Sequence, residues 1–344
     1  MANLNSLTTH GNYDLEKYLR EMIMASGPAF VPGNIYVVFN TSDEAYVQYA
    51  KDWDRVYDDG TQLIQTSLSA AYDATTSNRH DVIILNAHNG HALTTMLTVS
   101  GNRTHFYGMG MREGGFGVGA RARVTMGNST TSADIGLLKV TGVGNTFDNI
   151  KFDSSSTVAA SIYCVVDGGE YTIFRNCEIY KTGDKATTGA ADLVANGDSS
   201  QFIRCWIGSG DVANSPTTAV IRANILFTGD LAAAGKRCRD NIFDECVIIK
   251  AAGNSANRMV YGAAADAVNR LVWFKGCLFF NNPGSGASCA VAIDFGAAQT
   301  QGAVLVDQNC SSVDVTVVGA TGEGVYVLSP SSPTYATAGV AVNA

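Results

Sequence analysis

The sequence predicts an all-β protein, a single-stranded parallel β-helix (a solenoid) with a small α/β cap at its N-terminus. Three observations carry this prediction. The composition is poor in the residues that long helices need, short strand-like segments dominate after residue 81, and one hexapeptide pattern recurs along the chain.

The composition argues against a helical protein. The 344 residues include 36 Gly, 6 Pro, 9 Lys and 8 Glu, and only 16% are charged. Solvent-facing helices draw heavily on Lys and Glu, so a helix bundle, coiled coil or helical solenoid is excluded. The hydrophobic fraction of 46% equally excludes general disorder.

The charge and the cysteine content limit the partners and the compartment. A formal net charge of -8 gives no basic field, so we expect no nucleic-acid binding. The first 22 residues carry no basic and apolar signal segment, and no long apolar run follows, so we expect no membrane association. Eight cysteines without a CxxC pair are typical of a protein made in a reducing cytoplasm, with no metal and no cofactor.

The N-terminal part differs from the rest of the chain. Residues 1–78 are predicted to form the cap and attachment segment, followed by the β-helix over 79–319 and by a strand and apolar tail over 320–344. Within the cap, apolar spacing predicts one strand at 34–41 and helical stretches at 14–25, 42–53 and 59–75. These helices would cover the open end of the solenoid.

The repeat is Phe-x-x-[Cys/Ile]-x-[Ile/Phe]. Its copies are FDNIKF (147–152), FRNCEI (174–179), FIRCWI (202–207), FDECVI (243–248) and FKGCLF (274–279), with a decayed copy at 307–313. The fourth positions are 27, 28, 41, 31 and 33 residues apart. Three short strands with turns need about that length for one coil, which indicates a parallel β-helix.

The alternation within the repeat predicts which side chains point inward. The Phe residues and the fourth-position residues should stack on their equivalents one rung away, which places Cys177, Cys205, Cys246 and Cys277 in one internal column. Such a column is a metal or disulfide chain, or simply a set of small hydrophobic residues, and the second interpretation is favoured.

The outward positions of neighbouring repeats carry opposite charges. They predict exposed ion pairs between Asp148 and Arg175, between Asp244 and Lys275, and between Lys151 and Glu178. Exposed pairs of this kind are worth about 0.2–1 kcal/mol each, so their main effect is to fix the register of the strands.

At this point residues 80–319 resemble the right-handed, pectate-lyase-like parallel β-helix family. The segments 80–110 and 133–152 are similar to the opening coils of β-helical structural proteins of tailed-phage virions, and 325–344 is similar to their ends. The resemblance implies a right-handed β-helix, and it raises polysaccharide cleavage as the activity to look for.

The sequence motifs of that activity are missing from the coils. The only Asp-Asp pair, Asp58-Asp59, precedes the first coil, and Asn89-Gly90-His91 is not the Gly-His-Gly element of the related hydrolases. Hydrolysis needs two carboxylates held at a fixed separation, whereas the outward acids of the repeats alternate with bases. We therefore predict no catalytic residues. A site formed between subunits remains open, from the scattered acids Asp167, Glu170, Asp198 and Asp294.

Two further segments invite a functional interpretation. His88 and His91, with His80 nearby, have the spacing of metal ligands, but the Asn-Gly between them favours a polar turn. The glycine-rich segment 108–124 lacks the βαβ setting of a phosphate-binding loop, which favours a loop between rungs. Arg103, Arg112, Arg121 and Arg123 surround it, either as a positive patch that binds an acidic partner or as a solvated loop.

The sequence thus predicts a non-enzymatic virion structural protein, a β-helical capsid decoration, cement or head-spike protein. Its partners would be the major capsid protein or other virion proteins and further copies of the chain, with a trimer as one symmetric arrangement. The alternative is a receptor-binding tailspike that binds or depolymerises host surface polysaccharide, with Tyr180 and Trp206 as outward aromatic candidates. A third, weaker hypothesis is a cytosolic carbohydrate-active enzyme, which would be a polysaccharide lyase or a glycoside hydrolase.

Overall fold

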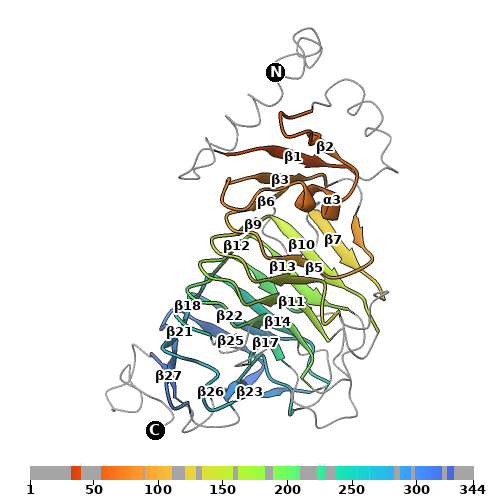
Figure 1. Ribbon diagram of the computed structural model, residues 1–344. Coiled ribbons are helices and arrows are strands. Elements are labelled where there is room, and N and C mark those ends of the chain that lie inside the picture. Colours follow the sequence, from red (N-terminus) through yellow and green to blue (C-terminus); the bar gives the residue numbers. More distant parts are fainter. Residues whose placement is uncertain are drawn as a thin grey trace, which may run out of the picture.

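The structure is a computed structural model of the 344-residue chain. It describes residues 32–39, 56–87, 90–110, 121–128, 134–157, 162–182, 189–209, 223–228, 238–253, 255–262, 264–282, 287–295, 299–319 and 324–328. These residues form a column of stacked strands, with the N-terminal strands at one end and the C-terminal strands at the other (Figure 1).

Three parallel sheets run along the column. Sheet 1 consists, in spatial order, of β2 (Ile64–Gln65), β1 (Ile35–Val38), β3 (Val82–Leu85), β6 (His105–Gly108), β9 (Thr146–Asp148), β12 (Ile173–Arg175), β15 (Gln201–Ile203), β18 (Asn241–Asp244), β21 (Leu271–Lys275), β24 (Ala303–Val306) and β27 (Val325–Val327). Sheet 2 consists of β4 (His91–Leu93), β7 (Ala122–Met126), β10 (Ile150–Ser154), β13 (Glu178–Lys181), β16 (Trp206–Ile207), β19 (Val247–Lys250), β22 (Leu278–Asn281) and β25 (Ser311–Val313). Sheet 3 consists of β5 (Leu97–Val99), β8 (Leu138–Val140), β11 (Tyr163–Asp167), β14 (Ala191–Ala195), β17 (Ala223–Phe227), β20 (Val260–Gly262), β23 (Cys289–Phe295) and β26 (Val315–Gly319).

From β3 onward the chain visits the three sheets in a fixed order. Each coil passes from sheet 1 to sheet 2, then to sheet 3, and back to sheet 1 one rung further along. Neighbouring strands within the sheets pair in parallel, for example Phe147 with Phe174. The predicted fold class, a right-handed parallel β-helix, is confirmed.

The N-terminal part agrees only in part with the prediction. The strand expected at 34–41 is β1, whereas the helices expected at 14–25 and 42–53 lie outside the described residues. The helix expected over 59–75 is shorter: it is α3 (Leu68–Asp73), capped by the Ser67 side chain, which accepts a hydrogen bond from the Ala70 N–H. Ahead of it, Ile64 pairs with β1 as part of β2, because its side chain is buried there with the core of the column.

A ladder of stacked phenylalanine rings fills the core. Consecutive rings of sheet 1 lie nearly parallel, with centroids 4.6 to 5.2 Å apart; they belong to Phe106, Phe147, Phe174, Phe202, Phe243 and Phe274. All six side chains are buried. The inward stacking predicted from the repeat is confirmed, and the ladder begins one rung earlier than the repeat, at Phe106.

The turn from sheet 1 to sheet 2 explains the spacing of the repeat. One residue in each of five successive turns has a positive φ of 51° to 58°, and these residues are Asn149, Asn176, Arg204, Glu245 and Gly276. Each directly precedes the Cys or Ile at the fourth position of the repeat. A single left-handed residue turns the chain within a very short distance, so the Phe two residues before it and the Cys or Ile directly after it both face inward.

The three predicted ion pairs between rungs are present. Arg175 lies 2.7 Å from Asp148, Lys275 lies 3.2 Å from Asp244, and Lys151 lies 3.3 Å from Glu178. The expectation that all are exposed was wrong for Asp148, which is fully buried, and for Glu178, which is also buried. The Asn176 side chain donates to its other oxygen and, with Arg175, shields it from solvent.

A second hydrophobic cluster lies on the outer side of sheet 3. It contains Val166, Val194 and Leu226 from three neighbouring strands, together with Tyr163 and Ala191, and all of these side chains are buried. The outer face of sheet 3 along β11, β14 and β17 is therefore apolar and withdrawn from solvent.

Candidate functional site

Polar and aromatic side chains gather on the outer face of sheet 2. Strand alternation turns Arg123 of β7, Lys151 and Asp153 of β10, and Glu178 and Tyr180 of β13 away from the core, and we call these five residues the sheet-2 cluster. Parallel register aligns them, because Lys151 pairs with both Arg123 and Glu178, and Asp153 pairs with Tyr180.

The cluster is a connected network. Arg123 forms an ion pair with Asp153, whose other oxygen accepts a hydrogen bond of 2.8 Å from the Thr182 hydroxyl. The Tyr180 hydroxyl donates to Asp153 at 3.5 Å, and the Lys151 ammonium lies 5.0 Å from the centre of the Tyr180 ring. Lys151 also pairs with Glu178, so the network spans three rungs.

Burial and charge act against each other in this network. Withdrawal from solvent raises the pKa of the Tyr180 hydroxyl above its ordinary value. Burial alone would lower the pKa of Lys151, but the contacts with the Tyr180 hydroxyl and the Glu178 carboxylate outweigh it, and the pKa is raised. The hydrogen bond to Asp153 likewise raises the pKa of Arg123. Two cations thus face two carboxylates, and the cluster is balanced in charge.

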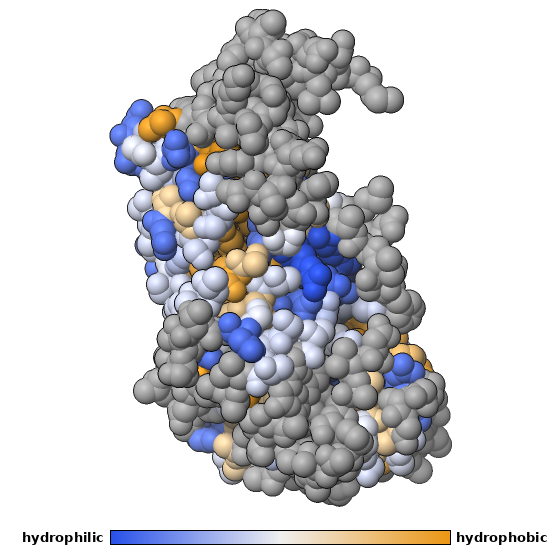
Figure 2. Space-filling view, turned by 90° about the vertical axis from the view of Figure 1, so that its right-hand side faces the viewer, coloured by the Kyte–Doolittle hydropathy of each residue, from blue (hydrophilic) through white to orange (hydrophobic). Residues whose placement is uncertain are grey.

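The same face becomes apolar beyond the cluster. Trp206 of β16 pairs with Glu178, and Val247 and Leu278 continue its row in the next two rungs. Figure 2 shows how unevenly the surface of the described residues is divided, with hydrophilic side chains concentrated halfway along one face beside hydrophobic ones. Aromatic rings beside hydrogen-bonding groups suit ligands that have both apolar faces and hydroxyl groups.

The paired carboxylates of the cluster do not have the arrangement of a hydrolase. Asp153 and Glu178 lie on neighbouring rungs of one face, but each contacts a cation. Hydrolysis by two carboxylates requires one of them to deliver a proton. The geometry therefore favours binding over acid–base chemistry at this position.

The four scattered acids do not form one site within the chain. Asp167 is fully buried in β11, while Glu170 and Asp198 lie next to each other at the corner between sheets 3 and 1. Asp198 lies 3.7 Å from Arg239, and Asp294 of β23 forms an ion pair with Arg258. Only Glu170 and Asp198 are brought together, and their participation in a site between subunits stays a prediction.

The histidine arrangement differs from the one the sequence suggests. His91 is buried and contacts the Asn86 carbonyl oxygen at 2.8 Å, and His88 lies outside the described residues. His80 stacks instead on His105, with ring nitrogens 3.0 Å apart, because β3 and β6 are neighbouring strands. Among the residues that the structure describes, no three His, Cys, Asp or Glu side chains are grouped so that they could hold a metal ion.

The arginines near the glycine-rich segment do not share one surface. Arg123 belongs to the sheet-2 cluster, whereas Arg103 occupies the turn from sheet 3 to sheet 1 with a φ of 57°. Arg112 and residues 111–120 lie outside the described residues. Gly108 ends β6 where a Cβ atom would collide with the Asn149 carbonyl of the next rung, so this glycine serves close packing.

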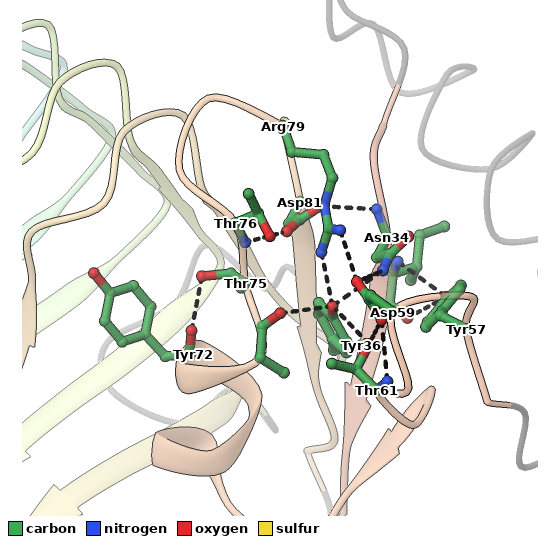
Figure 3. A network of polar contacts seen from close by, with 12 residues as sticks. Asn34, Tyr36, Tyr57, Asp59, Thr61, Tyr72, Thr75, Thr76, Arg79 and Asp81 are labelled. Carbon is green, nitrogen blue, oxygen red and sulfur yellow. Dashed lines mark hydrogen bonds and ion pairs between the residues drawn. The ribbon is translucent and has the colours of Figure 1, made fainter.

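A second polar network joins the first strands to the column (Figure 3). Arg79 binds both Asp59 and Asp81, at 2.8 and 2.7 Å, and also donates to the Tyr36 hydroxyl. Asn34 donates to Asp59, to Asp81 and to Tyr36. Hydrogen bonds from the side chain of Thr61 and from Arg79 lower the pKa of Asp59 below its ordinary value. The network connects β1 and β3 with the segment before β2, which makes it a structural joint.

Sequence reasoning missed parts of both networks. It considered Asp58-Asp59 only as a possible hydrolase motif, and it gave no partner for Arg79, Asp81 or Tyr36, whose partners lie far away along the chain. The Arg123–Asp153 pair was also missed, because Arg123 belongs to a rung without the Phe-x-x-Cys pattern. The alternation of charged and apolar residues over 121–126 was the signal that pointed to an outward Arg123.

No protein-family model and no curated protein matches the chain. It is similar to solved structures in its parallel β-helix fold. A pectin methylesterase from Yersinia enterocolitica is 13% identical, with a TM-score of 0.46 over 77% of this chain and 94% of that one. A pectate lyase is 11% identical, with a TM-score of 0.48 over 84% and 64%. The Dettilon tailspike protein is 12% identical, with a TM-score of 0.33 over 85% and 69%. Similarity at this level carries no information about activity.

Proposed function

We propose that the chain is a non-enzymatic structural protein of a phage particle, a β-helical capsid decoration, cement or head-spike protein. The observation that carries the proposal is that the acids on the outer side of the sheets and turns pair with bases of neighbouring rungs. Seven ion pairs between neighbouring rungs hold outward acids of the described residues, and they are Asp148–Arg175, Asp153–Arg123, Glu178–Lys151, Asp198–Arg239, Asp240–Arg270, Asp244–Lys275 and Asp294–Arg258.

Acids that pair with bases across neighbouring rungs fix the register of the stacked strands. Each pair bridges two successive rungs, so the charges stabilise the stacking of the coils against slippage. A polysaccharide-cleaving enzyme of this shape would instead need carboxylates that face a substrate. The pairing therefore supports a mechanical role for the solenoid.

The core supports the same role. The phenylalanine ladder runs through six rungs without interruption, and sheet 1 continues over eleven strands. A rod whose rungs share one continuous core resists local opening and therefore proteolysis. Such a rod suits a protein that must persist on the outside of a particle.

The expected partners are the major capsid protein, or another virion protein, and further copies of the chain. Symmetric assemblies, including a trimer, fit an elongated subunit, and obligate interfaces of that kind bury about 2,000 Å² or more. No helix within the described ranges is long and apolar enough to cross a membrane.

Copurification with particles tests the proposal. We expect the chain to sediment with intact virions at a fixed copy number and to bind purified capsids that lack it. Light scattering on the purified protein should give the molar mass of a closed oligomer. A protein that stays monomeric and is absent from particles would refute the proposal.

One observation favours the alternative, a receptor-binding tailspike that recognises host polysaccharide. Tyr180 and Trp206 lie on one face beside the hydrogen-bonding groups of the sheet-2 cluster. Under this alternative, Trp206→Ala lowers retention on immobilised polysaccharide at least tenfold, whereas Tyr171→Ala, an exposed aromatic away from this face, does not. Cleavage would appear as new reducing ends or as the absorbance of unsaturated products.

A further inference from the structure

Five cysteines occupy the same position in five successive rungs. They stand at the turn from sheet 1 to sheet 2, and they are Cys177, Cys205, Cys246, Cys277 and Cys310, which we call the thiol column. All five are free thiols. The parallel pairing of the strands on both sides of the turn places each cysteine above the preceding one. The thiol column is thus a continuous row of cysteine side chains along the solenoid.

The column is held by the backbone of the preceding rung. Each Sγ–H donates to the carbonyl oxygen of the ladder phenylalanine one rung earlier, at 3.2 to 3.4 Å; the acceptors are Phe147, Phe174, Phe202, Phe243 and Phe274. This repeated contact places every sulfur atom at the same height within its rung. The separation of neighbouring sulfur positions therefore follows the separation of the rungs.

One end of the column reaches the surface. The first four thiols are fully buried, but Cys310, in the last complete rung, is only partly buried. Its sulfur also accepts a hydrogen bond of 3.2 Å from the Cys277 backbone N–H. Cys310 is therefore the place where a small ion from solvent would meet the column, and Cys277 is the next thiol inward.

The spacing of the column matches one kind of metal coordination. Neighbouring strands lie about 4.8 Å apart. Two bonds of the length of a zinc–thiolate bond, about 2.3 Å, placed in a straight line span about 4.6 Å, and thiolate bonds to other soft ions are of similar length. Soft ions such as Cu(I) and Ag(I) select thiolate ligands, and two of them in a line suffice for such an ion. A tetrahedral ion needs more, and the described part of the chain has no group of three ligands.

We propose that Cys277 and Cys310 form a linear, two-coordinate site for a soft monovalent cation, and that the thiol column continues this site inward. On binding, each of the two Sγ–H bonds breaks, its proton goes to solvent, and a sulfur–metal bond forms without any change of oxidation state. The hydrogen bonds from these thiols to Phe243 and Phe274 are given up at the same time.

Three cysteines outside the column provide matched controls. Cys164, Cys238 and Cys289 are buried free thiols, but their partners are Phe152, Asn241 and Asn257 with Val291, and none of them contacts another cysteine in these hydrogen bonds. Burial raises the pKa of Cys164 and of Cys289 above the ordinary value of a thiol. These three thiols are buried like those of the thiol column, but none of them is stacked on another cysteine of a neighbouring rung.

Silver titration of the reduced protein under anaerobic conditions tests the site. Native mass spectrometry should show one tightly bound Ag(I) per chain at low excess, with release of protons and a rise in Tm of a few degrees. Cys310→Ala and Cys277→Ala should each abolish this first equivalent and the rise in Tm. Cys164→Ala and Cys289→Ala should retain both.

Three results would contradict the proposal. The proposal is wrong if Cys310→Ala binds the first Ag(I) as tightly as the parent chain, or if binding occurs only with loss of the near-ultraviolet circular dichroism of the folded state. It is also wrong if the isolated protein carries a disulfide between Cys277 and Cys310, seen as a mass lower by two hydrogen atoms. Should Cys277→Ala fail to fold, alkylation of Cys310 in the folded parent chain gives the same test.

Discussion

Arg175 of β12 donates two hydrogen bonds, of 3.0 and 2.7 Å, to one carboxylate oxygen of Asp148 on the preceding rung. The carboxylate is fully buried, while about a third of the Arg175 side chain remains exposed. A contact that the sequence suggests as a surface pair is thus a bond between a buried acid and a half-buried base, and its loss should be costly.

Asp148→Ala should destabilise the fold by about 2 kcal/mol, because it leaves Arg175 and the Asn176 amide without their acceptor. Urea denaturation gives the free energy of unfolding. Asp244→Ala is the matched control, since its pair with Lys275 has both side chains substantially exposed and should cost less than about 1 kcal/mol. Equal losses in the two variants would contradict this account.

Phe202→Ala should cost about 3–5 kcal/mol, because it removes a ring stacked between Phe174 and Phe243 in the middle of the ladder. Phe202→Leu keeps most of the volume and should cost clearly less. Thermal and urea unfolding of both variants would check the order. If the two substitutions proved equivalent, the stacking of the rings would not contribute as argued.

The rungs that carry the repeat could be predicted from the sequence. One residue with a positive φ in each turn from sheet 1 to sheet 2 imposes the same spacing between the inward Phe and the inward Cys or Ile. Phe106 was missed, since its rung has Met109 at the fourth position in place of Cys or Ile. The helix at 59–75 was overestimated, because its first residues read as helical but Ile64 is buried against β1. Within the sheet-2 cluster, the pair of Lys151 with Glu178 and the outward position of Tyr180 could be predicted. The contact of Arg123 with Asp153 could not, because it depends on the register between β7 and β10.

Stability should fall on acidification because of His105. Burial, and then the charge of neighbouring His80, lowers the pKa of His105 to about 3. In the unfolded chain its pKa is about 6.5, so the unfolded state binds the extra proton between these values. Stability is therefore fully present above pH 6.5 and decreases as the pH falls toward 3, by at most about 1.4 kcal/mol per pH unit.

Urea denaturation at pH 7 and pH 5 measures this loss, and His105→Gln should make it smaller. The groups that face the pair include His80 itself, Arg103 and Asp81; burial and then the charge of Arg103 lower the pKa of His80. His91→Gln is the comparison variant: burial lowers the pKa of His91 as well, so this substitution removes a separate contribution to the acid loss and leaves that of His105 in place. An unchanged pH dependence in His105→Gln would remove His105 as the cause.

Gly208→Ala should destabilise the column by about 2 kcal/mol or more. Gly208 has a φ of 100°, and a Cβ atom there would collide with the Asn224 side chain and the Ile249 carbonyl oxygen. Gly127→Ala is the matched control, because a Cβ atom at Gly127 meets nothing within 4 Å. We expect that substitution to leave the unfolding free energy unchanged within about 0.5 kcal/mol. Comparable losses at both positions would mean that glycine in these turns serves chain flexibility and not the close approach of rungs.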